Sequence, residues 1–169
     1  MILEYLNSYA QKAYREIMSI LNDPIFLFSN DPNLTRNEAN YNHLYIHGFN
    51  KLLKYNRISV EKVVEVFSFL EENIELYLKK HYIGKDFVLY FNADALIPAF
   101  TMTIVSYYEG ALLKKSLPLA EMVSWYQAKA YFDAIEIIED QIKSEYSVSE
   151  ESIEVIPDSI RTYIKVIHT

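Results

Sequence analysis

The sequence predicts an all-α fold, a single-domain antiparallel bundle of five or six helices that spans residues 1–169. Apolar residues recur every three or four positions along several long segments, as they do on the buried side of an amphipathic helix. The chain contains only three glycines and five prolines, too few for the many turns of a β-sandwich or barrel. At 169 residues it is long enough to bury one hydrophobic core, and no linker or internal repeat divides it.

Three helices are predicted in the first half of the chain, over residues 3–21, about 35–55 and about 60–83. The second begins with a capping box, in which Thr35 caps the helix and Glu38 reaches back to the cap. The third begins at Ser59, a good N-cap residue, and Gly84 is a typical end signal. Each segment has charged residues on the side opposite its apolar stripe, which favours packing side by side in a bundle.

The second half of the chain is predicted to be helical as well, with two ambiguous segments. Residues 87–91 are uncharged and suit either a short strand or the start of a helix, and residues 163–167 suit a helix or an edge strand. Between them we expect a nearly uncharged, buried helix over 94–113 and an amphipathic helix over 119–146. The bundle is therefore expected to carry at most a minor β element near 87–91 and 163–167.

Composition excludes several kinds of protein. The chain has no cysteine, which excludes a disulfide scaffold, a thiolate zinc site and a cysteine nucleophile. Its first residues lack the features of a secretory signal, and no apolar run is long enough to cross a bilayer, so a cytoplasmic location is expected. There is no glycine-rich phosphate loop and no G-x-S-x-G motif, and no cofactor is expected.

Charge is distributed very unevenly along the chain. Residues 133–158 contain nine acids and one base, a net charge of −8, whereas the rest of the chain has a net charge of +1. A concentrated negative field attracts a basic partner and repels nucleic acid and anionic membranes. The alternative is that these acids form a solvated surface that keeps an acidic protein in solution.

Two histidines, His43 and His47, are spaced four residues apart in the predicted second helix. Residues at this spacing lie on one face of a helix, so the two imidazoles could bind one metal ion. A metal site needs at least one further ligand, for which Glu38 and His81 are candidates. The alternative is that both are ordinary surface or core histidines.

Arg36-Asn37, followed by His43 after five further positions, resembles the motif of the HEPN ribonuclease family. The resemblance implies RNA cleavage, usually across a dimer, with Arg36 and His43 as the catalytic pair and Asn37 as a polar helper. It covers eight residues. It lies near the N-terminus, whereas the family usually places the motif on a late helix of its bundle.

The residues by themselves favour an interaction protein over an enzyme. We expect a small acidic inhibitor, similar to an immunity protein or antitoxin, that covers a basic protein such as a nuclease toxin without touching nucleic acid or membrane directly. The enzyme alternatives are a HEPN-like ribonuclease that uses Arg36 and His43 and a metal-dependent helical-bundle enzyme that uses His43 and His47. A structural or oligomeric helper is the third class. The residues expected to bind the partner are Tyr131, Glu136, Glu139, Asp140, Tyr146, Glu150, Glu151, Glu154 and Asp158.

Overall fold

The computed structural model contains a four-stranded antiparallel sheet packed against helices, so the all-α prediction is wrong. The structure describes residues 2–22, 28–46, 48–95, 99–111, 113, 115–129 and 160–169. Its helical elements are α1 (Ile2–Leu21), the 3-10 turn η1 (Pro32–Leu34), α2 (Thr35–Tyr41), α3 (Phe49–Lys54), α4 (Val60–His81) and α5 (Leu119–Lys129). Its strands are β1 (His43–Ile46), β2 (Asp86–Asp94), β3 (Ala99–Ser106) and β4 (Ile160–His168).

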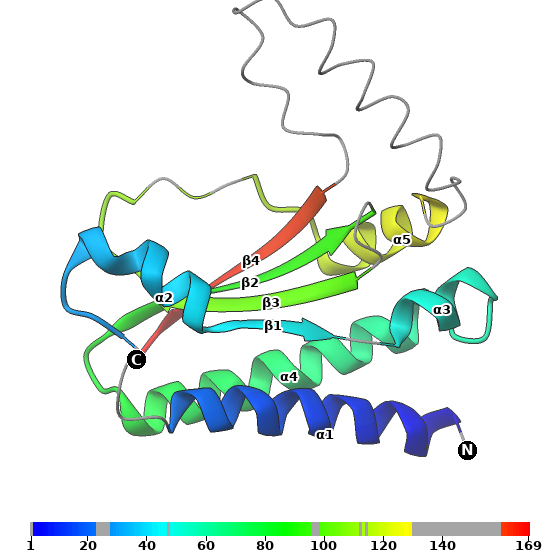
Figure 1. Cartoon of the computed structure of the whole chain (residues 1–169), viewed down its shortest axis with the longest axis horizontal. Coiled ribbons are helices and arrows are strands. Elements are labelled where there is room, and N and C mark those ends of the chain that lie inside the picture. The colour runs from blue at the N-terminus through cyan, green and yellow to red at the C-terminus, as the bar shows by residue number, and fades with distance from the viewer. Residues whose placement is uncertain are drawn as a thin grey trace, which may run out of the picture.

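The strands lie in the order β1-β3-β2-β4, and every neighbouring pair is antiparallel (Figure 1). β2 and β3 form the central pair, so β1 and β4 are the edges. A segment that precedes α5 runs along the outer edge of β4. There the Leu117 amide donates to the Thr162 carbonyl at 2.9 Å, and the Ile164 amide donates to the Ser116 hydroxyl at 3.0 Å. These bonds satisfy backbone groups that an edge strand otherwise exposes.

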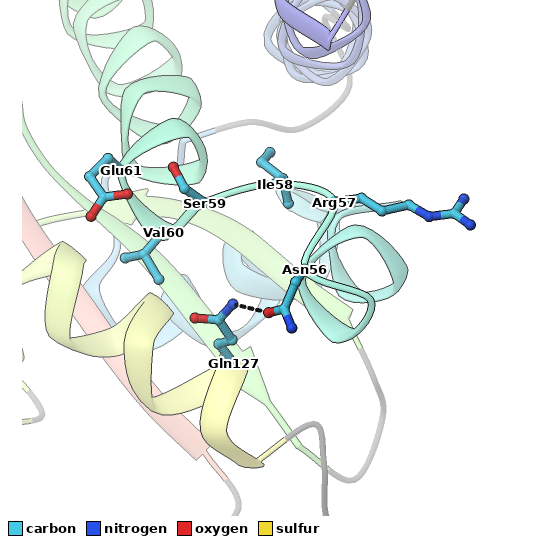
Figure 2. A pocket seen from close by; sticks show the side chains of 7 residues that line it. All are labelled: Asn56, Arg57, Ile58, Ser59, Val60, Glu61 and Gln127. Atoms are coloured by element: carbon cyan, nitrogen blue, oxygen red, sulfur yellow. Dashed lines mark hydrogen bonds between the residues drawn. The ribbon is translucent and has the colours of Figure 1, made fainter.

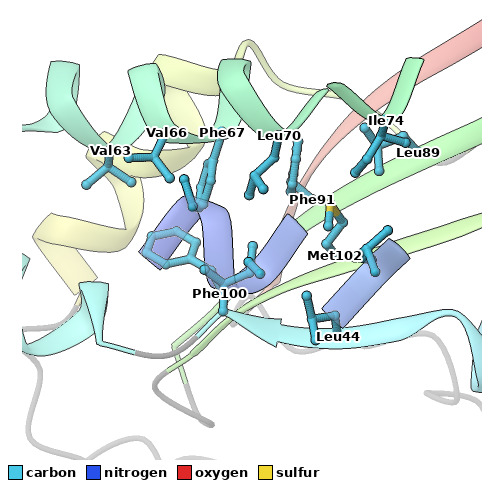
Figure 3. Close-up of a cluster of buried hydrophobic side chains, with 14 of the residues drawn as sticks. Leu44, Val63, Val66, Phe67, Leu70, Ile74, Leu89, Phe91, Phe100 and Met102 are labelled. Carbon is cyan, nitrogen blue, oxygen red and sulfur yellow. The ribbon is translucent and has the colours of Figure 1, made fainter. Parts of the chain in front are cut away.

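The hydrophobic core lies between the sheet and the helices α1 and α4. Figure 3 shows the apolar side of α4 directed at the strands, with Phe67, Leu70 and Ile74 above Phe91 and Phe100. Along α4 the fully buried positions recur at helical spacing: Val63, Phe67, Leu70, Ile74 and Leu78 are 0% exposed. Helix α5 adds Met122, Val123 and Tyr126 to the same core.

The predicted helices over 3–21 and 60–83 are confirmed as α1 and α4. Ser59 is the N-cap of α4, as predicted, and its hydroxyl accepts a hydrogen bond from the Lys62 amide at 3.3 Å. The bond satisfies one of the amides that a helix leaves without a partner in its first turn. Gly84 follows the helix with a φ of 78°, the left-handed conformation expected of a glycine after a helix end.

Replacing Ser59 with alanine is expected to lower the free energy of unfolding by about 1 kcal/mol, because the Lys62 amide loses its acceptor. Ser59→Asp keeps an acceptor at the cap and places a negative charge at the helix N-terminus, so it should leave stability unchanged or raised. Urea unfolding followed by circular dichroism measures both. An unchanged free energy of unfolding in Ser59→Ala would show that the cap contributes nothing.

The predicted second helix over 35–55 is wrong as a continuous element. It is divided into α2, strand β1 and α3, and Gly48 between β1 and α3 has a φ of 97°, which an α-helix does not allow. The predicted capping box is also absent. Thr35 is the first residue of α2 and donates its hydroxyl to the Pro32 carbonyl, while the Glu38 side chain is buried elsewhere.

Glu38 instead joins the start of α2 to the end of β3. Its carboxylate is 3% exposed and accepts hydrogen bonds from the Ser29 amide at 2.5 Å, the Ser106 amide at 2.7 Å and the Ser106 hydroxyl at 3.1 Å. The Tyr108 hydroxyl donates to the Ser29 carbonyl at 2.7 Å and closes the same cluster. A buried carboxylate is tolerated here because donors from two distant segments surround it.

The predicted helix over 94–113 is wrong, because residues 99–106 form β3. All eight residues of β3 are buried, so the segment has no polar face from which a helical or strand period could be read. The ambiguous segments 87–91 and 163–167 both adopt the strand alternative, within β2 and β4. The predicted helix over 119–146 is confirmed as far as Lys129, and its continuation lies outside the described residues.

Candidate functional site

All nine residues predicted to bind a partner lie between 130 and 159, outside the described residues. What the structure describes is the pair of elements that flank residues 130–159, which we call the acidic segment. Before it comes α5, which ends at Lys129, and after it comes β4, which begins at Ile160. The structure therefore locates the base of the segment, and the charge of the segment itself is read from the sequence.

The two elements at the base contact each other. The Arg161 guanidinium on β4 lies over the Trp125 ring of α5, 4.8 Å from its centroid. Trp125 is four residues before the end of α5, and Arg161 is the second residue of β4. Cation–π contacts of this geometry are favourable, and this one joins the two elements that flank the acidic segment.

Strand β4 is also tied to α4 by a small polar network. The Tyr163 hydroxyl donates to a Glu71 carboxylate oxygen at 2.6 Å, and the Lys165 ammonium lies 3.4 Å from the other oxygen. Burial, together with the Glu71 carboxylate, raises the pKa of Tyr163, so its hydroxyl stays protonated and remains a donor at physiological pH. Just beyond the end of the strand, the Thr169 hydroxyl lies within hydrogen-bonding distance of the Tyr82 and Lys85 carbonyls in the turn after α4.

His43 and Arg36 are separated by the break between α2 and β1. Arg36 is exposed on α2, and His43 lies on the strand, where its Nδ1 is 2.9 Å from the Thr103 hydroxyl. Burial lowers the pKa of His43, so the imidazole is neutral at pH 7. The two residues therefore lie on different elements, whereas the sequence interpretation placed both on one helix.

The hypothesis that His43 and His47 bind one metal ion assumed that both lie on one helix, and the break between α2 and β1 removes that assumption. His43 belongs to a strand, where a residue four positions away does not lie one helical turn above it. His47 lies outside the described residues. In the part of the chain that the structure describes, no group of three or more His, Cys, Asp or Glu side chains could hold a metal ion.

A polar row crosses the sheet at the level of Tyr45, two residues along β1 from His43, and sequence reasoning missed it. Asn92 on β2 donates to the Thr101 hydroxyl of β3 at 3.3 Å and accepts a hydrogen bond from Thr162 of β4 at 2.8 Å. These three residues are partners in the strand register. The alternation of Thr101 and Thr103 was the available signal for a strand, and the prediction of a helix over 94–113 hid it. The row satisfies its own hydrogen bonds within the sheet.

A shallow hollow of about 410 Å³ lies where α5 approaches the start of α4. Figure 2 shows Gln127 of α5 joined to Asn56 by a hydrogen bond of 3.3 Å, while the Arg57 side chain extends away from the hollow. The Ser59 hydroxyl lowers the pKa of Glu61, which therefore stays ionised. Most of the lining residues belong to a turn and to the start of α4. We see no pair of side chains among them that could act as a general acid and a general base.

No helix in the described ranges combines the length and the apolar character needed to span a membrane. Comparison with protein-family models, with curated proteins and with solved structures finds no match for this chain. The interpretation of function therefore depends on the charge distribution, on the anchored base of the acidic segment and on the surfaces of the described elements.

Proposed function

We propose that this chain is a small acidic protein-binding inhibitor, similar in action to an immunity protein or antitoxin, that neutralises a basic partner such as a nuclease toxin in the cytoplasm. One observation carries the proposal. Residues 133–158 have a net charge of −8 while the rest of the chain has a net charge of +1. The charge is thus localised in one segment and is not a general property of the surface.

The physical basis is competition for a cationic surface. A nuclease binds its substrate through basic side chains, and a segment rich in carboxylates can occupy the same side chains. The negative field also speeds the capture of such a partner. Tyr131 and Tyr146 lie in the acidic segment and are expected to supply contact area at a low cost in side-chain entropy.

The described elements support a binding role more than a catalytic one. His43 is bonded to a buried threonine hydroxyl, and the described residues offer no metal cluster. The contact between Trp125 and Arg161 joins α5 and β4, the two elements that flank the acidic segment. We therefore make no second proposal from Arg36, His43 or His47.

The test is retention of a basic protein from host-cell lysate on the immobilised chain at low salt, with release by a salt step and identification by mass spectrometry. The triple variant Glu136→Lys, Glu139→Lys, Asp140→Lys should bind the retained protein at least about tenfold more weakly and with a flatter salt dependence. If the retained protein is a nuclease, the purified wild-type chain should also inhibit its cleavage of nucleic acid.

The matched control is Glu16→Lys, Glu61→Lys, Glu109→Lys, which changes the net charge equally at described positions that precede α5 and the acidic segment in the chain. It should retain most of the affinity. Equal weakening by both triple variants would mean that net charge alone matters. Unchanged binding in the acidic-segment variant would remove these residues from the interface.

A further inference from the structure

Helix α4 exposes large apolar side chains on the side opposite the core. Phe69 is 40% exposed and Leu76 is 68% exposed, and Ile83, in the turn just beyond the helix, is 83% exposed. Phe69 and Leu76 are seven residues apart, the interval at which a helix presents side chains to a second helix in a coiled coil, and Ile83 follows seven residues later in the turn. We refer to Phe69, Leu76 and Ile83 as the outer stripe.

The outer stripe is distinct from the surfaces that α4 already uses within the fold. Its core side is occupied by Phe67, Leu70 and Ile74, and the side toward β4 carries Glu71, which bonds Tyr163. In Figure 3 the labelled core side chains of α4 point toward the sheet. These contacts among the described residues leave the outer stripe exposed.

Charges beside the outer stripe are separated along the helix axis. Glu65 and Glu72 precede Leu76, and Lys79 and Lys80 follow it. Glu65 already pairs with Lys62 of its own helix at 2.6 Å, and Lys79 pairs with Glu75 at 2.6 Å, so Glu72 and Lys80 carry the difference between the two ends. In the described part of the chain, Glu72 and Lys80 are exposed and form no ion pair. The surface is therefore acidic at one end and basic at the other.

We propose that the outer stripe binds a second copy of this chain, with the two α4 helices antiparallel and the two-fold axis near Leu76. Each Leu76 then meets the other copy's Leu76, and Phe69 approaches the second copy's Ile83. The acidic end of each helix meets the basic end of the other. Glu72 of one copy then lies beside Lys80 of the other copy, in the last helical turn of α4. Such an interface is isologous and self-complementary.

The charge pattern selects the antiparallel arrangement over the parallel one. In a parallel pair Glu72 would face Glu72 and Lys80 would face Lys80, and like charges at such an interface are repulsive. The contact area offered by three side chains and their neighbours is small, so the dimer should be concentration-dependent. The inference is independent of the proposed inhibitor function, which concerns residues 130–159.

Sedimentation velocity of the full chain over a concentration series tests the association. The wild type should shift from monomer to dimer, and Leu76→Asp should raise the dissociation constant at least about tenfold, because it places two carboxylates at the two-fold axis. Leu113→Asp changes another exposed leucine, 37% exposed and outside the stripe, and should associate like the wild type. A chain that stays monomeric throughout, or equal loss in both variants, overturns the proposal.

A charge exchange on the exposed surface tests the same contact without touching apolar residues. Glu72→Lys should weaken association, because two basic ends then meet. The double variant Glu72→Lys, Lys80→Glu exchanges the two signs and should restore it. Failure of the double variant to recover the wild-type dissociation constant would contradict the pairing.

Cysteine cross-linking tests the orientation, and it is clean because the chain has no cysteine of its own. Leu76→Cys, at the axis, should oxidise to a disulfide-linked dimer. Phe69→Cys should not, since the two copies of residue 69 are separated by fourteen helical rises, about 21 Å. A mixture of Phe69→Cys and Ile83→Cys should cross-link. Ready cross-linking of Phe69→Cys alone would indicate a parallel pair and overturn the antiparallel proposal.

Discussion

Replacing Phe67 with alanine is expected to lower the free energy of unfolding by about 3–5 kcal/mol, the largest effect of any single substitution considered for this chain. The Phe67 ring is 0% exposed. It stacks on Phe91 at 4.9 Å and makes edge contacts with Phe100 at 5.1 Å and Phe49 at 6.1 Å. Removing it leaves a cavity between α4, the central strands and α3, which the packed strands cannot close.

Phe69 provides a matched control on the same helix. It is 40% exposed, so Phe69→Ala should cost less than about 1 kcal/mol when unfolding is measured at a concentration low enough for a monomer. Urea unfolding followed by circular dichroism and by Trp125 fluorescence gives both values. Similar losses for the two variants would contradict the assignment of Phe67 to the core and Phe69 to the surface.

Replacing Glu38 with leucine is expected to cost about 2–4 kcal/mol. The substitution leaves the Ser29 and Ser106 amides buried without an acceptor, and each unsatisfied donor costs about 1–3 kcal/mol. Glu38→Gln should cost less than Glu38→Leu, because one side-chain oxygen remains as a hydrogen-bond acceptor. Some cost remains, because the NH2 group of the glutamine would face a donor that the second carboxylate oxygen now accepts from. Hydrogen exchange should show faster exchange of these two amides in both variants.

Glu109→Gln is the matched control for Glu38→Gln, because Glu109 is exposed in a turn. It should change stability by less than about 0.5 kcal/mol. If Glu38→Gln were equally neutral, the three hydrogen bonds to the buried carboxylate would contribute nothing to stability, and the cluster would be only a packing contact.

The sequence predicted the elements whose signal is local. The apolar stripes of α1 and α4 and the cap at Ser59 follow from helical spacing and from hydrogen bonds within one turn, and the structure confirms them. The same reasoning failed for residues 35–55. There the helical spacing continues through Gly48, but pairing of residues 43–46 with β3 overrides it. Glu38 was expected to serve its own helix and instead bonds Ser106, 68 residues away.

The sheet could not be predicted from local sequence because its stabilisation comes from partners distant in sequence. β3 is covered on every side, and its neighbours β1 and β2 come from residues 43–46 and 86–94. A segment buried on both faces has no alternation, so period alone does not separate a strand from a buried helix. The threonines and β-branched residues of 101–105 favour a strand, and they were outweighed by the apolar run around them.

By itself the sequence determined the two long amphipathic helices, the absence of cysteine chemistry and the position of the acidic segment, because composition, period and charge are properties of the chain alone. Only the tertiary structure decided the rest. Strand pairing converted a predicted helix into β3, separated Arg36 from His43, and brought α5 against β4 at the base of the acidic segment. It also decided which of the phenylalanines on α4 is buried in the core and which is exposed, because burial depends on where the sheet lies.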